Sequence, residues 1–428
     1  MSIESSPPDA AGGQSPLRIL LYTLITTSNQ FSPIRRTFGA YLRNRLVRFA
    51  HLASWYLTGR WNAQYWQYED VQNSNLGDIA VRLGVKKALQ AAFVGQAVEF
   101  IEVAWGELSS ELITNYHDEL DLVVIGGGGY LFLDKNGMLP KRFLNDVEAL
   151  RHAKCPIVAT SIGLNQLMLK NDVPARFHPE QREIVRQFVN SLSRFSVRDV
   201  TTQRAFSIAA GASPPVIVDP GYLLSENQCA MARRVQGSPI YIGLNLSFHG
   251  PFASGLSQQA MTALVQVLKR LSATIPCRFS YFCHADSGRG IVAALRAKGI
   301  RLNVFGGSVD GLLDGYRQLD VHIGAMMHSS ILAMSCGVPT LALAYDVKSA
   351  GFFELFGLGN LIIPLPTLDE ETLYLRIVDL VARRREIAAI IASNDRQLRQ
   401  NSIEFYNEIS ALTLTSSRSR GKNEQKTQ

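Results

Sequence analysis

Short apolar runs alternate with helical patterns along most of the chain. In the first half, the apolar runs lie at residues 17–24, 121–128, 155–163, 194–199 and 215–221. Each run is short, rich in strand-forming residues and followed by a stretch with helical periodicity. This alternation predicts the strands of a parallel sheet joined by helices.

The same alternation returns in the second half after an interruption at residues 227–239, which predicts a linker. Beyond it we predict strands at 240–248, 277–283, 301–306, 320–324, 340–345 and 360–365, and helices at 255–272, 287–298, 328–336 and 368–393. The pattern therefore predicts an α/β protein with two Rossmann-like domains, residues 17–226 and 240–412, that face each other across a cleft. The polar tails, residues 1–16 and 413–428, are expected to be disordered.

Composition agrees with this architecture and narrows the expected partners. A chain of 428 residues is too long for one ordinary core, and 46% hydrophobic against 18% charged residues excludes a disordered chain. The net charge of +7 suits an anionic small molecule or a membrane surface as well as nucleic acid. We expect an anionic small substrate and no nucleic-acid partner.

The sequence has no motif for secretion, membrane spanning or metal binding. Its start lacks a charged region followed by an apolar one, and no apolar run approaches the roughly 20 residues that span a bilayer. The five cysteines form no C-x-x-C pair and no zinc spacing. We therefore expect a cytoplasmic protein with reduced cysteines and with neither metal nor cofactor.

One segment, residues 32–68, departs from the strand–helix alternation. From Gln14 to Tyr68 the chain has seven arginines and no acidic residue. Apolar side chains recur there at helical spacing, at Phe38, Leu42, Leu46, Phe49, Ala53 and Tyr56. A basic amphipathic helix of this kind suits contact with the inner face of an anionic membrane. The alternative is a helix packed on the first domain with its arginines in solvent.

Two early segments carry candidate ligand-binding residues. In NSNLGDIA, Asn75 is predicted to cap a helix, and Asp78, three residues later, either completes the cap or binds sugar hydroxyls. The strand at 121–128 runs into four glycines, Gly126, Gly127, Gly128 and Gly129. Such a run permits positive φ and the close approach of a ligand, but it does not match the dinucleotide-binding pattern.

Further candidates stand where predicted strands end. Arg198 in SVRD can bind a carboxylate or phosphate through its planar guanidinium, or pair with a nearby carboxylate. Asp219 precedes a Pro-Gly turn, where aspartate is also common for local reasons. His284 and Lys348 each follow an apolar run of the second half.

The sharpest candidate is His328 in GAMMHSSILAMSCGVP, where a predicted strand turns into a helix. The free N–H groups at a helix start carry partial positive charge and attract anions, and the hydroxyl and amide of Ser329 could add to such a site. The residues before the histidine are Met326 and Met327, where an anion site would be expected to have a cation. A buried structural histidine is the alternative.

The segments NLGDIA, DLVVIGGGG, SVRD, DPGYLL and GAMMHSSILAMSCGVPTLALAYDVKSAGFFELFGL together resemble the polysaccharide pyruvyl transferase family, from about residue 72 to about residue 360. The resemblance implies a fold like that of the GT-B glycosyltransferases. It also implies transfer of the enolpyruvyl unit of phosphoenolpyruvate to a sugar of a cell-surface polysaccharide or its precursor, forming a pyruvate ketal. The family's Gly-x-Arg-x-His falls on Gly324–His328, where Met326 replaces the arginine.

The resemblance also implies roles for the candidate residues. His328 would bind the phosphate and donate a proton, and Arg198 and Lys348 would bind the anionic groups of phosphoenolpyruvate. Asp78 and the Gly126–Gly129 loop would face the acceptor, a glycan or a lipid-linked sugar.

Two alternatives stay open. In the first, the helix start with histidine and serine binds the diphosphate of a nucleotide-sugar, and the protein is a GT-B glycosyltransferase. A catalytically impaired homologue that binds glycan or a partner protein is suggested by Met326, unless Arg289 or Arg317 supplies the missing cation.

Overall fold

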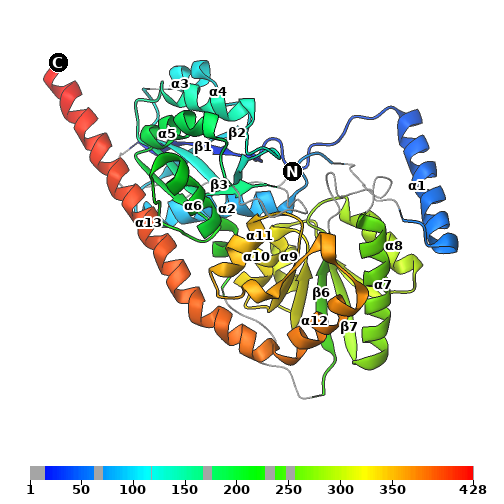
Figure 1. The fold of residues 1–428 in the computed structure, drawn as a ribbon. Coiled ribbons are helices and arrows are strands. Elements are labelled where there is room, and N and C mark those ends of the chain that lie inside the picture. The colour runs from blue at the N-terminus through cyan, green and yellow to red at the C-terminus, as the bar shows by residue number, and fades with distance from the viewer. Residues whose placement is uncertain are drawn as a thin grey trace.

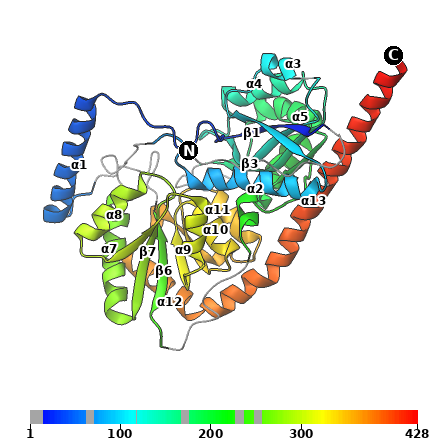
Figure 2. The same cartoon turned by 180° about the vertical axis from the view of Figure 1, so that it is seen from behind.

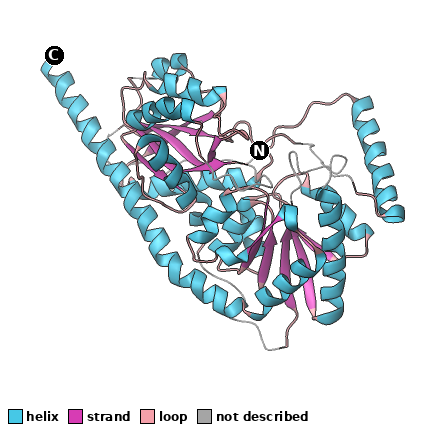
Figure 3. Cartoon of the chain, viewed as in Figure 1, coloured by secondary structure: helices cyan, strands magenta, loops and turns pink. Residues whose placement is uncertain are grey.

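Two parallel sheets, each covered by helices on both faces, form the body of the protein (Figure 3). The structure is a computed structural model that describes residues 15–61, 71–116, 118–166, 176–226, 237–246 and 256–427. The predicted α/β architecture with two Rossmann-like sheets is confirmed. Residues 1–14 of the predicted N-terminal tail and most of the predicted linker lie outside the described residues.

The first sheet has the strand order β2-β1-β3-β4-β5, and all of its pairs are parallel. Its strands are β1 (Leu17–Thr23), β2 (Val98–Ala104), β3 (Leu122–Phe132), β4 (Ile157–Asn165) and β5 (Arg194–Val197). The chain moves from β1 outward to β2 and then returns to the other side of β1. The strand order therefore reverses between β1 and β3, which makes this a topological switch point.

The second sheet has the order β11-β10-β9-β6-β7-β8, again with parallel pairs. Its strands are β6 (Ile240–Asn245), β7 (Cys277–Phe282), β8 (Leu302–Phe305), β9 (Val321–Gly324), β10 (Thr340–Ala344) and β11 (Ile362–Pro364). Its order reverses between β6 and β9, which gives a second switch point.

The helices of the first half are α1 (Phe38–Thr58), α2 (Leu76–Ala92), α3 (Ser110–Tyr116), α4 (Lys141–Leu150), α5 (Arg182–Ser191) and α6 (Val200–Ala210). Those of the second half are α7 (Leu256–Thr274), α8 (Gly288–Ala297), α9 (Val309–Tyr316), α10 (Met327–Ser335), α11 (Lys348–Glu354), α12 (Glu370–Ala382) and α13 (Arg384–Thr427). The helix predicted at 368–393 is thus two helices.

The strand predicted at 215–221 is wrong. Only one bridge forms there, between Val216 and Val197, and the chain continues into the 3-10 helix Pro220–Leu224. Prolines on both sides of the apolar run remove backbone donors that a strand needs. The edge strand β2 was not predicted, because glutamates interrupt its apolar pattern.

Helix α13 joins the two halves of the molecule (Figures 1 and 2). It begins beside the second sheet, and its later residues Phe405, Tyr406 and Ile409 are buried in the core of the first. The Tyr406 hydroxyl lies 2.8 Å from Oγ1 of Thr160 in β4. The predicted domain limit at residue 412 therefore misplaces this part of the chain, and residues 413–427 continue the helix instead of forming a disordered tail.

Helix α1 lies on the opposite side of the molecule from α13 (Figure 1). It packs on α8 of the second half, where Nε1 of Trp55 donates to the carbonyl of Ala294 at 3.0 Å. The helix is confirmed, but the alternative in which it packs on the first domain is wrong. No helix within the described residues combines the length and apolarity needed to cross a bilayer.

An apolar cluster joins the two sheets at the start of α2. Leu76, Ile79 and Ala80 pack there against α9 and α10. This contact buries the first turn of α2 in the second half of the molecule, and it fixes how the carboxyl ends of the two sheets meet.

Candidate active site

The carboxyl ends of both sheets meet at one cavity of about 120 Å³. The first sheet contributes residues at or after the ends of β1, β3, β4 and β5, namely Leu24, Gly129, Phe132, Asn165 and Arg198. The second contributes residues after β9 and β10, namely Met326, Met327, His328, Tyr345 and Lys348. The cavity thus lies where the two switch points face each other, the usual ligand position in open α/β sheets.

His328 stands in the first turn of α10 between two carboxyl groups. Its Nδ1 lies 3.8 Å from Oδ1 of Asp78, and its Nε2 lies 3.8 Å from Oδ2 of Asp219. Each ring nitrogen therefore faces an acidic group from the first half of the molecule. Gly77 permits this arrangement, because a Cβ at that position would overlap the His328 ring.

The first turn of α2 holds Asp78 in place. Asn75 caps the helix as predicted, accepting from the amide of Gly77 at 3.0 Å. The Asn75 side-chain amide also donates to Oδ2 of Asp78 at 2.6 Å. Both predicted residues line the cavity, so the cap and the site share the same side chains.

Arg198 is buried at the edge of the cavity, where three side chains contact its guanidinium. Its guanidinium lies 3.5 Å from Asp199 and 3.7 Å from Asp219, and it donates to Oδ1 of Asn165 at 3.0 Å. Gly163 on β4 leaves room for it, because a Cβ there would overlap the guanidinium. Asp199 also caps α6 by accepting from the amide of Thr202.

Lys348 begins α11 and reaches the cavity from the second sheet. Its Nζ lies 3.7 Å from Asp346 and 5.4 Å from the centre of the Tyr345 ring. Burial alone would lower the pKa of Lys348, but electrostatic interactions with Tyr345 and Asp346 raise it. Lys348 therefore remains a cation at neutral pH.

The buried carboxyl groups titrate in opposite directions. Burial raises the pKa of Asp78 and of Asp199, despite nearby cations. Burial also opposes ionisation of Asp219, but its neighbours His328 and Arg198 lower its pKa. Asp219 is thus the carboxylate held most firmly in its charged form by the site's cations.

The glycine run has two separate roles. Gly127 and Gly128 adopt positive φ, and a Cβ on Gly127 would meet Val81 and Pro220. Gly129 lines the cavity, and its carbonyl accepts from Nδ2 of Asn165 at 3.1 Å. The glycines therefore serve mainly to bring α2 and Asn165 close to β3.

Two predicted site residues turn away from the cavity. The Ser329 hydroxyl donates to the Met326 carbonyl at 2.9 Å and lies 3.1 Å from Nε2 of His322. His284 is buried with its Nε2 2.8 Å from the Tyr316 hydroxyl, and burial together with the charge of nearby histidines places its pKa well below the usual value. His284 supports the site indirectly, because its carbonyl accepts from the amide of Leu76 at the start of α2.

Met326 lines the cavity at the position of the expected cation. Its amide donates to Oδ1 of Asn245 at 3.2 Å, and its Sδ lies 3.8 Å from Nδ2 of the same residue. Arg289 pairs with Asp286 at 3.2 Å, and Arg317 pairs with Asp314 at 2.8 Å. Neither arginine lines the cavity, so neither replaces the cation missing at Met326.

The sequence did not indicate several residues that build the site. Gly77 and Gly163 make room for the histidine and the arginine, Asn165 orients that arginine, and Trp105 forms part of the cavity wall. Asn165 is a polar residue at the end of an apolar strand, much as Arg198 directly follows one. This position could have identified Asn165 as a candidate from the sequence.

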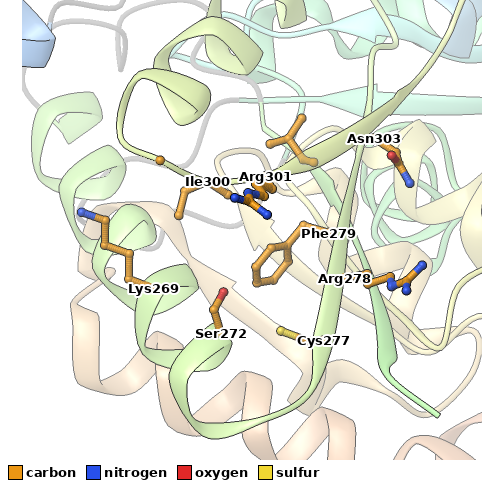
Figure 4. Close-up of a pocket in the computed structure, with 10 residues that line it drawn as sticks. Lys269, Ser272, Cys277, Arg278, Phe279, Ile300, Arg301 and Asn303 are labelled. Carbon is orange, nitrogen blue, oxygen red and sulfur yellow. The ribbon is translucent and has the colours of Figure 1, made fainter.

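A larger hollow of about 680 Å³ lies elsewhere in the second half (Figure 4). Cys277 and Arg278 begin β7, and Arg301 and Leu302 stand at the start of β8. These are the amino ends of the strands, whereas ligands of open α/β sheets bind at the carboxyl ends. The smaller cavity around His328 is therefore the better candidate for chemistry.

Comparison with known proteins gives a family for this chain and a set of similar folds. The family model described as polysaccharide pyruvyl transferase matches residues 75–347, which contain Asp78, Arg198, Asp219 and His328 and end one residue before Lys348. No curated protein matches the chain. Most of the residues around His328 thus fall within the matched part of the chain.

Several solved structures are similar to the chain at low identity. MurG of Acinetobacter baumannii is 13% identical, with a TM-score of 0.48 over 94% of this chain and 100% of that chain. An S. aureus MnaA–UDP co-structure is 11% identical, with a TM-score of 0.44 over 88% of this chain and 91% of that chain.

Proposed function

The chain belongs to the polysaccharide pyruvyl transferase family, and on that premise we propose that it moves the pyruvyl unit of phosphoenolpyruvate onto two hydroxyls of a sugar. The acceptor is a cell-surface polysaccharide or its precursor. One observation carries the proposal: Arg198, His328 and Lys348, from three separate segments, meet at one cavity. Phosphoenolpyruvate presents a phosphate and a carboxylate, which require several cations in a site partly closed to water.

The reaction needs one proton donor and two successive attacks at C2 of phosphoenolpyruvate. A proton adds to the methylene carbon while the first sugar hydroxyl bonds to C2 and releases its own proton. Phosphate then leaves, the second hydroxyl bonds to C2, and the proton of that hydroxyl passes to the departing phosphate, giving the ketal and inorganic phosphate. His328 is the proposed proton donor, since it lies at the start of α10 and a carboxyl group flanks each ring nitrogen.

The cations divide the donor's charges between them. Lys348, which projects into the cavity, binds the phosphate together with the amide-rich start of α10. Arg198 lies deeper and serves the carboxylate. As phosphate leaves, these cations stabilise the charge that develops on it.

The acceptor side is less charged. Leu24, Trp105 and Phe132 line the cavity from the first half, and Phe132 is half exposed. Apolar and aromatic surfaces of this kind suit the C–H face of a pyranose ring, while Asp78 and Asn75 can bind its hydroxyls.

Phosphate release from phosphoenolpyruvate in the presence of a galactoside tests the proposal. We expect release that depends on the sugar and that His328→Ala abolishes. Arg289→Ala is the matched control, because Arg289 is a cation of the same half that lies outside the cavity. Sugar-independent release, or full activity of His328→Ala, would contradict the proposal.

Met326 supports a second candidate, a homologue that binds glycan but turns over slowly or not at all. Its thioether lines the cavity and supplies no charge for the donor. If wild type shows neither phosphate release nor phosphoenolpyruvate binding and Met326→Arg restores binding, this candidate replaces the first. A nucleotide-sugar that raises the melting temperature when phosphoenolpyruvate does not would favour a glycosyltransferase instead.

A further inference from the structure

Helix α1 exposes a strip of large apolar side chains that no described part of the chain covers. Among the described residues it carries eight exposed large apolar side chains, which are between 37% and 80% exposed: Phe38, Tyr41, Leu42, Leu46, Val47, Phe49, Tyr56 and Leu57. The rest of the described chain, many times longer, exposes ten. Burying such a strip would lower the free energy of the molecule, so its exposure indicates a binding surface.

Five of these eight side chains form a narrow strip that is basic at its edges. At about 100° per residue, Phe38, Leu42, Leu46, Phe49 and Tyr56 fall within a sector of roughly 80°, whereas Tyr41 and Val47 lie outside it. Arg45 follows one edge of this sector and Arg43 lies beyond the other. The helix contains no acidic residue.

We propose that α1 binds the surface of a membrane that contains anionic lipids, with its apolar strip among the lipid chains and its arginines at the headgroups. A narrow apolar face bordered by arginines is the pattern of helices that lie in the membrane interface. Each arginine near an anionic surface strengthens binding about fivefold. A second copy of the chain is a poorer occupant, because pairing two such helices would bring their arginines together.

The helix is held to the protein by its other face. Trp55 is buried on α8, and the Lys298 ammonium lies 4.6 Å from its ring centre and 3.2 Å from the carbonyl of Tyr56. Directly after Lys298 come Gly299 and Arg301, which line the basic hollow of Figure 4. The strip is therefore on a fixed element, and further positive charge lies close to its C-terminal end.

The segment that carries α1 begins and ends at the candidate active site. Leu24 before it and Asn75 after it both line the cavity. Near the body its two arms are joined by the Pro33–Val71 bridge and by a hydrogen bond from Gln72 to the Ser32 carbonyl at 2.7 Å. A membrane-bound α1 would hold the site near the surface, which suits a lipid-linked acceptor; this last step alone rests on the proposed function.

Vesicle co-sedimentation without any substrate tests the membrane proposal by itself. We expect wild type to pellet with vesicles of equal parts phosphatidylcholine and phosphatidylglycerol, much less with phosphatidylcholine alone, and less as salt rises. The double variants Leu46→Glu/Phe49→Glu and Arg43→Glu/Arg45→Glu should each reduce binding at least about tenfold.

The matched control is Ile208→Glu/Leu375→Glu, which charges two exposed apolar side chains on α6 and α12. It should bind vesicles as wild type does, and far-UV circular dichroism should show all variants folded. The proposal is overturned if wild type does not pellet, or if the control loses as much binding as the α1 variants. It is also overturned if sedimentation equilibrium shows a dimer that Leu46→Glu/Phe49→Glu dissociates while vesicles are not bound. None of these results bears on phosphate release, so the transferase proposal stands or falls separately.

Discussion

The two walls of the candidate site are built differently. In the first half, Arg198 and Asp219 are 3% and 1% exposed and are bound to each other and to their neighbours. In the second half, the side chains of His328 and Lys348 are 13% and 16% exposed and make ion pairs of 3.7 to 3.8 Å. The first wall is a packed scaffold, whereas the second presents charge to the cavity. Met326, where the sequence resemblance implies an arginine, also lies in the second wall.

The largest effect on stability should come from removing the cation of the first wall. Arg198→Met leaves Asp199 and Asp219 buried without it, so we expect a loss of about 3–5 kcal/mol in the free energy of unfolding. Arg289→Met is the control, because the Arg289 side chain is 63% exposed and its ion pair with Asp286 is worth under about 1 kcal/mol. Thermal unfolding measures both, and equal losses would show that the first wall is not a scaffold.

The contact between the walls gives a smaller effect. Gly77→Ala places a Cβ against the His328 ring, so the helix or the histidine must move at a cost of about 1–3 kcal/mol. Gly39→Ala is the matched helical control, since open space surrounds that position and alanine favours a helix by up to about 1 kcal/mol. If both variants melt at the same temperature, the walls do not touch as described.

The smallest effects are expected from pH, and they have opposite signs at two carboxyl groups. Burial raises the pKa of Asp78 above its ordinary 3.8, so wild type loses stability as pH rises through the raised pKa. Asp78→Asn removes this loss, so the variant should be more stable than wild type at neutral pH.

At Asp219 the pKa is lowered below 3.8, so its ionised form stabilises the fold above that pH, and the benefit disappears on acidification. Asp219→Asn should therefore be the less stable protein at neutral pH, and it should approach wild type as the pH falls. Urea unfolding at pH 3 to 7 compares the two variants, and differences of the same sign would contradict these pKa directions.

The sequence was sufficient to predict most of the strands and several of the residues that line the cavity. Buried parallel strands read as continuous apolar runs, and Asn75, Arg198 and His328 stand where such runs end or helices begin. The edge strand β2 was not predicted, because Glu99 and Glu102 interrupt the apolar pattern on both of its faces. Packing between distant segments could not be predicted either. No local pattern shows that α13 returns to the first sheet or that α1 packs on the second half.

The sequence also could not show which candidate side chains point into the cavity. Ser329 and His328 are neighbours in one helix turn, yet Ser329 bonds within the protein while His328 faces the cavity. Gly77 and Gly163 matter only for the side chains that approach them from other segments. These are tertiary contacts, so the spacing of residues along the chain does not predict them.

The central claim is that His328 and Lys348 bind one phosphoenolpyruvate molecule together. A double-mutant cycle tests this claim directly: phosphoenolpyruvate binding is measured by isothermal titration calorimetry for wild type, His328→Asn, Lys348→Met and the double variant. We predict that each single change weakens binding by about tenfold or more and that the double variant loses less than the sum of the two free-energy changes. Binding that neither substitution alters, or losses that simply add, would contradict a shared site.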